Sequence, residues 1–231
     1  DGFGTFGSTT EGLFDDEVDL EHFESEGLRY FSNVMGSYTI PVSRAIEKLA
    51  DLDIEVLAPT HGPVWRDDPG RIIRKYEQWA EMRGEGALIA YGSMYGNTQG
   101  LVDAIESGLE AGGVEEITKL DVTETSLSQL LASAWGSEAV VIGAPTYDAG
   151  IYPPVDQFLS LLERKKLTGK IGTVFGSKGW GGGATRGVKS IIDDLDWDVV
   201  EPVLEFGGMP DDEVHAEGRT LGESVADRMA D

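Results

Sequence analysis

Short apolar runs alternate with amphipathic segments along the chain from residue 86 onward. The apolar runs are typical of strands buried on both faces, and the segments between them carry the 3.6-residue period of surface helices. The expected strands cover residues 87–91, 116–120, 139–143, 171–175 and 199–206. The expected helices cover residues 99–111, 126–134, 154–165 and 185–195, with a last helix that ends near Met229. This strict alternation predicts an α/β fold, a doubly wound parallel sheet covered on both faces.

Residues 1–85 follow a different pattern, with a Gly-rich aromatic opening and an acidic loop before the first regular element. The expected elements are helices around residues 23–35, after Pro41 and over residues 69–83, and a strand at residues 54–57. These elements offer too few strands to close a sheet of their own. We therefore expect residues 1–85 to be the C-terminal part of a larger domain, followed by a separate domain over residues 86–231.

The chain is strongly acidic, with 18 Lys and Arg residues against 42 Asp and Glu residues and a net charge of −24. Nucleic acid and anionic membrane surfaces are disfavoured as partners, because both attract positive charge. The excess of acids extends over both segments, so it is not an acidic tail. It is typical of halophilic proteins, whose surface charges are screened by concentrated salt, although an ordinary acidic cytosolic protein is the alternative.

Cysteine is absent from the sequence, which excludes disulfides, thiolate metal sites, iron–sulfur clusters and cysteine nucleophiles. No apolar run approaches 18 residues, and no signal-peptide pattern is present, so we expect a cytoplasmic protein without a membrane segment. The chain opens on Asp1 rather than Met, which leads us to expect a further segment upstream.

The loop after the first expected strand, Ser93 to Thr98, is the first candidate for ligand binding. In an open α/β sheet the ligand lies beyond the carboxyl ends of the strands, and unpaired N–H groups at a helix start bind phosphate. Gly92 and Gly96 permit backbone angles that other residues resist. No Lys occupies the Walker position, so a nucleoside triphosphate with magnesium is disfavoured. The alternative is that Asn97 or Thr98 only caps the following helix.

Two further loops follow the third and fourth expected strands, and each holds one aromatic residue among small ones: Tyr147 in residues 144–150 and Trp180 in residues 176–183. A flat redox-active ring packs well on such aromatics. The predicted cofactor contacts are Ser93, Met94, Tyr95, Gly96, Asn97, Thr98, Pro145, Thr146, Tyr147, Asp148, Ser177, Gly179, Trp180, Gly181 and Gly182. Residues 179–184 also fit the dinucleotide pattern G-x-G-x-x-A, but they follow the fourth strand rather than the first, which disfavours direct NAD binding.

On these loops, residues 86–231 resemble the flavodoxin family. The run Ser93-Met94-Tyr95-Gly96-Asn97-Thr98 matches the FMN phosphate loop of that family, and the other two loops fall where its ring-binding loops lie. The resemblance implies a five-stranded sheet of order 2-1-3-4-5 and one non-covalently bound FMN.

The preceding segment resembles flavodiiron proteins (A-type flavoproteins), through residues 1–7, 29–33 and 58–63 followed directly by a flavodoxin module. The resemblance implies that residues 1–85 are the C-terminal part of a metallo-β-lactamase-like αβ/βα domain that holds a di-iron centre. Asp1 matches the carboxylate that bridges the two irons, and His61 matches the last histidine ligand. Carboxylate and imidazole suit iron. The remaining ligands of the family are expected upstream of Asp1.

The function implied by this resemblance is FMN-dependent electron transfer to a di-iron centre that reduces dioxygen, nitric oxide or both. It also implies a head-to-tail homodimer, supplied with electrons by a rubredoxin-like protein or an NAD(P)H-dependent flavin reductase. Two alternatives stay open: a flavodoxin-type FMN electron carrier whose first 85 residues only pack, and a zinc hydrolase of the metallo-β-lactamase superfamily.

The acidic composition generates a prediction about salt. Raising KCl from about 0.1 M to about 2 M should raise the melting temperature, because salt screens the repulsion between surface carboxylates. Thermal melting followed by circular dichroism measures this change. A melting temperature that stays flat across the range would leave an ordinary acidic protein.

Overall fold

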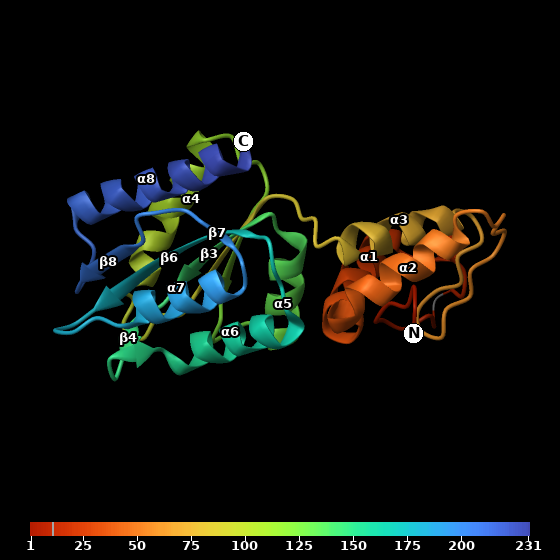
Figure 1. Cartoon of the computed structure of the whole chain (residues 1–231), viewed down its shortest axis with the longest axis horizontal. Coiled ribbons are helices and arrows are strands. Elements are labelled where there is room, and N and C mark those ends of the chain that lie inside the picture. Colours follow the sequence, from red (N-terminus) through yellow and green to blue (C-terminus); the bar gives the residue numbers. More distant parts are fainter. Residues whose placement is uncertain (11) are drawn as a thin grey trace. The chain divides into compact units, whose positions relative to one another are not determined.

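The computed structural model describes residues 1–10 and 12–231, which divide into two compact units (Figure 1). The first unit covers Asp1–Gly84 and the second covers Glu85–Asp231. Among the described residues, no helix is both long and apolar enough to cross a membrane.

The second unit is built on a parallel sheet of order β2-β1-β3-β6-β7 (Figure 1). Strand β1 (Ala87–Tyr91) lies between β2 (Ile117–Asp121) and β3 (Ala139–Gly143), and β3 pairs on its other side with β6 (Ile171–Lys178). The α/β fold and the order 2-1-3-4-5 are therefore confirmed. A small antiparallel hairpin of β4 (Thr146–Tyr147) and β5 (Gly150–Ile151) follows β3 and was not predicted.

The prediction of one fifth strand over residues 199–206 is wrong, because two short strands occupy this part of the chain. Strands β7 (Asp198–Val199) and β8 (Leu204–Gly207) both pair in parallel with β6. Pro202 lies between them and has no N–H group to donate to a ladder, which explains the break. The apolar pattern marked the correct segment but did not resolve this interruption.

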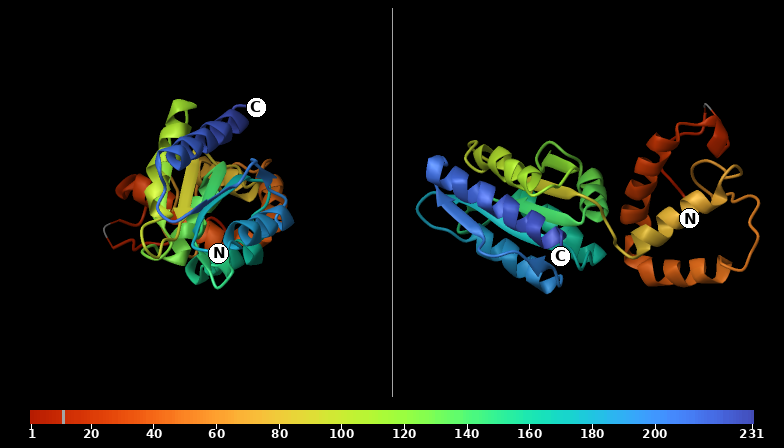
Figure 2. Two further views of the ribbon diagram at one scale, coloured as in Figure 1. Left: turned by 90° about the vertical axis from the view of Figure 1, so that its left-hand side faces the viewer. Right: turned by 90° about the horizontal axis from the view of Figure 1, so that it is seen from above.

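Helices cover both faces of the sheet (Figures 1 and 2). The helices α4 (Val102–Ala111) and α8 (Asp212–Met229) pack on one face and on each other. The opposite face carries α5 (Leu127–Gly136), α6 (Pro153–Lys165) and α7 (Ala184–Asp194). The predicted helices are thus confirmed with small shifts at their ends, and the first begins as a 3₁₀ turn over Gln99–Leu101.

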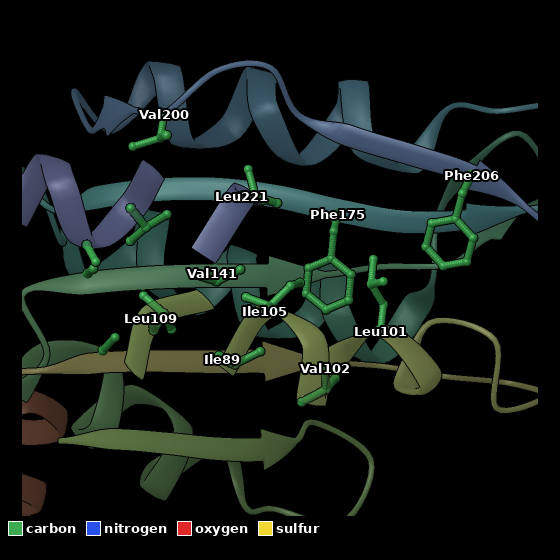
Figure 3. Packing of buried hydrophobic residues seen from close by; sticks show 14 residues of the cluster. Ile89, Leu101, Val102, Ile105, Leu109, Val141, Phe175, Val200, Phe206 and Leu221 are labelled. Carbon is green, nitrogen blue, oxygen red and sulfur yellow. The ribbon is translucent and has the colours of Figure 1, made fainter. Parts of the chain in front are cut away.

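The core beneath α4 and α8 is formed by apolar side chains of three central strands, as Figure 3 shows. Ile89, Val141 and Phe175 come from β1, β3 and β6, and each is fully buried. They meet Ile105 of α4 and Leu221 of α8 in one cluster. The burial of these side chains between the sheet and the two helices stabilises the parallel pairing.

The first unit consists of helices and long loops. Its helices are α1 (Leu20–Tyr30), which continues through a π-helical segment at Phe31–Met35, α2 (Thr39–Leu49) and α3 (Pro69–Ala80). The buried rings of Phe31, Tyr76 and Trp79 pack against one another with centroids 5.1–5.8 Å apart. The Tyr76 hydroxyl donates a hydrogen bond of 2.7 Å to the Gly4 carbonyl, so this core also holds the N-terminal loop.

The strand expected at residues 54–57 is wrong. Leu57 forms an isolated antiparallel bridge with Trp65, and residues 54–56 lie outside any strand of the described chain. Alternation of apolar and acidic residues mimicked a strand here, but a strand needs a neighbouring ladder, which these residues lack.

Lys170 is a buried lysine immediately before β6. Its Nζ donates hydrogen bonds to the carbonyls of Trp135 at 2.9 Å and Ser137 at 2.6 Å, which joins β6 to the end of α5. Burial lowers the pKa of Lys170 from its ordinary value of 10.5 to about 8, since the charged form is costly to desolvate.

This lowered pKa predicts that the free energy of unfolding rises with pH between about 8 and 10.5. Below pH 8 the amine is protonated in both states, whereas above it the folded state has released a proton that the unfolded state still binds. The gain approaches about 3 kcal/mol at pH 10.5. Denaturant unfolding at pH 7 and pH 10 should show this gain in the parent protein and lose it in Lys170→Met. The partly exposed control Lys189→Met should keep it, and equal pH dependence in the parent and Lys170→Met would contradict the prediction.

Candidate functional site

A cavity of about 600 Å³ opens in the second unit where β1, β3 and β6 end. Three chain segments that are far apart in the sequence line it, together with Gly208 after β8, because parallel strands end at the same edge of the sheet. The lining residues are Ser93, Met94, Tyr95, Asn97, Pro145, Thr146, Asp148, Ala149, Ser177, Lys178, Gly179, Trp180, Gly181 and Gly208.

The structure brings most of the predicted contacts around this one cavity. Gly96, Thr98, Tyr147 and Gly182 were predicted but are not among its lining residues. Ala149, Lys178 and Gly208 line it and were missed. Lys178 stands between Ser177 and Gly179, two of the predicted contacts, so its position in the sequence was a signal that could have identified it.

The loop Ser93–Thr98 lies beside the cavity and has backbone N–H groups without partners in the described structure. The Ser93 hydroxyl accepts hydrogen bonds from the N–H groups of Gly96 at 3.1 Å and Gln99 at 3.5 Å, so it shapes the turn. Gly96 has φ +83°, in the left-handed region that favours glycine. No hydrogen bond within the described residues occupies the N–H groups of Met94, Tyr95 or Asn97. Such free donors at the start of a helical segment fit a phosphate group.

Thr98 lies beneath this loop rather than in the cavity wall. Its side chain is fully buried, and its hydroxyl lies 2.8 Å from the hydroxyl of Ser177. This pair joins the loop after β1 to the end of β6. The alternative that Asn97 or Thr98 only caps the helix is wrong, since neither side chain makes a capping hydrogen bond to the 3₁₀ turn that begins at Gln99.

Aromatic side chains stand unusually exposed around the cavity. Trp180 is fully exposed, Tyr95 is 85% exposed and Tyr147 is 46% exposed. Asp148 and Ala149, in the hairpin turn beside Tyr147, have φ +47° and +60°, a strained backbone for residues other than glycine. Exposed aromatics and local strain of this kind are typical of ligand sites, and here they fit a planar ring.

Two charged side chains line the cavity, Asp148 and Lys178. The Lys178 Nζ lies 2.8 Å from Glu205 Oε2, so its charge is paired. The loop that fits a phosphate therefore relies on backbone donors, and its positive potential comes from N–H groups rather than a nearby cation.

In the first unit, the two predicted metal ligands lie side by side. His61 Nε2 is 3.3 Å from Asp1 Oδ1, and both side chains are more than half exposed. The His61 carbonyl accepts a hydrogen bond from the Thr5 N–H at 3.3 Å, which holds the two loops together. The described residues contain no group of three or more His, Cys, Asp or Glu that could hold a metal, so this pair alone does not form a di-iron site.

Residues 89–219 match the family model described as Flavodoxin. The chain belongs to the flavodoxin family. Over its full length it is 33% identical to the nitric oxide reductase of Moorella thermoacetica, of which it covers 58%, across 236 aligned residues. It is 29% identical, over 94% of its length, to the anaerobic nitric oxide reductase flavorubredoxin of Vibrio vulnificus, of which it covers 44%.

Its fold is that of solved flavodiiron proteins. All of the chain superposes on 57% of the flavodiiron protein of Giardia intestinalis with a TM-score of 0.94 and 24% identity. These matches confirm the resemblance to flavodiiron proteins. The chain spans about half the length of the curated relatives it matches.

The buried hydroxyl pair generates a prediction about the site's framework. Ser177→Ala and Thr98→Val should each lower the free energy of unfolding by about 1 kcal/mol, because each leaves a buried hydroxyl without its partner. The double variant should lose less than the sum, since the same bond is removed only once. Urea denaturation of the three variants measures this coupling, and additive losses would contradict it.

Proposed function

We propose that the chain binds FMN in the 600 Å³ cavity and passes electrons to a di-iron centre that reduces dioxygen or nitric oxide. The observation that carries the proposal is the convergence on one cavity of a loop with free N–H groups and of exposed aromatic side chains. Phosphate and planar ring are the two recognition elements of FMN, and the family match of residues 89–219 supports the same cofactor.

In this proposal, each loop has a separate task. The N–H groups of Met94, Tyr95 and Asn97 bind the phosphate, and the Asn97 side chain adds a donor. Trp180 and Tyr147 lie against the ring, and the small residues of their loops let backbone groups approach its polar edge. FMN, when bound, supplies a ring that takes up and releases two electrons.

We further propose that Asp1 and His61 are ligands of the di-iron centre. Their 3.3 Å separation supports this role, because residues from two loops are already held at the spacing of a shared metal site. The other ligands then belong to the part of the relatives' length that this chain does not cover. A head-to-tail homodimer is the proposed assembly, with a rubredoxin-like protein or an NAD(P)H-dependent flavin reductase as electron donor.

The alternative is a flavodoxin-type electron carrier without a metal centre. The adjacent carboxylate and imidazole of Asp1 and His61 favour the di-iron proposal, because a unit that only packs would need neither. A zinc hydrolase is disfavoured, since it leaves the cavity of the second unit without a use. Iron analysis of a longer protein, one that also includes the part matching the rest of the relatives' length, separates these functions.

We propose a cytoplasmic location, supported by the absence of cysteine in the sequence. We also propose adaptation to concentrated salt, which rests on the net charge of −24 alone.

Titration of the chain with FMN tests the proposed cofactor. The parent protein should bind one FMN with quenching of flavin fluorescence, and Asn97→Ala should weaken binding by about 1–3 kcal/mol, or roughly 5- to 150-fold, the scale of a lost hydrogen bond to a charged group. Asn33→Ala is the matched control in the first unit and should leave the affinity unchanged. A parent protein that fails to bind FMN would refute the proposal.

A further inference from the structure

The cavity wall contains an ion pair that the sequence analysis did not assign to the site. Lys178 is the last residue of β6 and lines the cavity, and its Nζ lies 2.8 Å from Oε2 of Glu205 in β8. Their side chains are 37% and 24% exposed, respectively, so both charges are partly removed from water. The pairing of β6 with β8 makes them diagonal neighbours on one face of the sheet, because Glu205 is in register with Gly176 and Lys178 lies two residues further along β6.

Glu205 is held at this position by several donors. Its Oε1 accepts a hydrogen bond of 3.0 Å from the Thr185 hydroxyl at the start of α7. The bond to Lys178, followed by that to Thr185 and by the Gly183 N–H, keeps the pKa of Glu205 below its usual range against the opposing effect of burial. A Cβ atom on Gly182 would lie 2.5 Å from both carboxylate oxygens, so the Gly-rich loop rests directly on this carboxylate.

The loop supported by Glu205 is the one that carries Trp180. Residues 179–181 of this loop line the cavity, and the next two residues, Gly182 and Gly183, contact the Glu205 carboxylate. The cavity therefore has a cation in its wall, Lys178, with an anion directly behind it. A change in either residue leaves the opposite charge uncompensated close to whatever the cavity holds.

Charges of this kind affect the reduction of a flavin, because reduction changes the charge of its ring. At neutral pH, two-electron reduction adds two electrons and one proton to the ring, which leaves it with one additional negative charge. A cation nearby stabilises this reduced form and an anion destabilises it, with an effect larger than in bulk water because the wall is partly desolvated.

We propose that the Lys178–Glu205 pair sets the reduction potential of the bound flavin, with the two charges acting in opposite directions. This inference rests on the proposed binding of FMN. Lys178 acts as the stabilising charge in the wall, and Glu205 both compensates that charge and positions it. Neither residue is needed for the phosphate to bind.

The test is a reductive titration with dithionite, in the presence of a reference dye, of the full chain loaded with FMN. Lys178→Met should lower the midpoint potential and Glu205→Gln should raise it, each by roughly a tenfold change in the ratio of the dissociation constants for oxidised and reduced FMN. For a two-electron couple a tenfold change corresponds to about 30 mV. The double variant Lys178→Met with Glu205→Gln should return close to the parent value, as should Lys178→Arg.

Lys119→Met is the matched control, because it makes the same change in net charge at an ion pair outside the cavity and should not move the potential. Opposite shifts that cancel in the double variant support the inference. Shifts in the same direction, which general damage to the loop would cause, or shifts no larger than the control overturn it while leaving FMN binding intact. Failure of the parent protein to bind FMN would instead refute the proposed function and this inference together.

Discussion

The parallel pairing of β1, β3 and β6 is the constraint on which the candidate site depends. The register sets Tyr91 beside Gly143 and Gly143 beside Phe175, so β1 and β3 end at one level, and β6 continues at the same edge of the sheet to Lys178. Each chain segment leaves the sheet there, and three loops meet although more than 80 residues separate the first from the last. The buried side chains of Ile89, Val141 and Phe175 beneath α4 and α8 hold that register, because a shift of one residue would turn them to the opposite face (Figure 3).

In the proposed function, a protein with a net charge of −24 binds the anionic phosphate of FMN without strong positive potential at its surface. The loop Ser93–Thr98 meets this condition with backbone N–H groups, whose partial charges are fixed by the turn at Gly96 and the helical segment that follows. The cation that does line the cavity, Lys178, is compensated by Glu205. Local dipoles and one ion pair therefore decide the electrostatics of the cavity, whereas the large net charge acts mainly over the exposed surface.

In the first unit, packing against the aromatic core brings two loops together. The buried Tyr76 hydroxyl holds the Gly4 carbonyl, and the Thr5 N–H binds the His61 carbonyl, so two loops without regular structure are fixed against the aromatic core. Asp1 and His61 are brought within 3.3 Å of each other in this way. Their proposed role as metal ligands thus depends on packing that is distant from the ligand atoms themselves.

The order of strands and helices from residue 87 onward, and the loops that line the cavity, followed from the sequence, because the apolar period and the glycine-rich breaks are local properties. The local pattern misled where a partner decides the outcome: residues 54–57 have no neighbouring strand in the described structure, and Pro202 interrupts the ladder beside β6. The burial of Thr98 against Ser177 and the pairing of Lys178 with Glu205 were decided only by the tertiary structure. These contacts join residues 79 and 27 positions apart, and their distances depend on strand pairing, which no pattern within a single segment encodes.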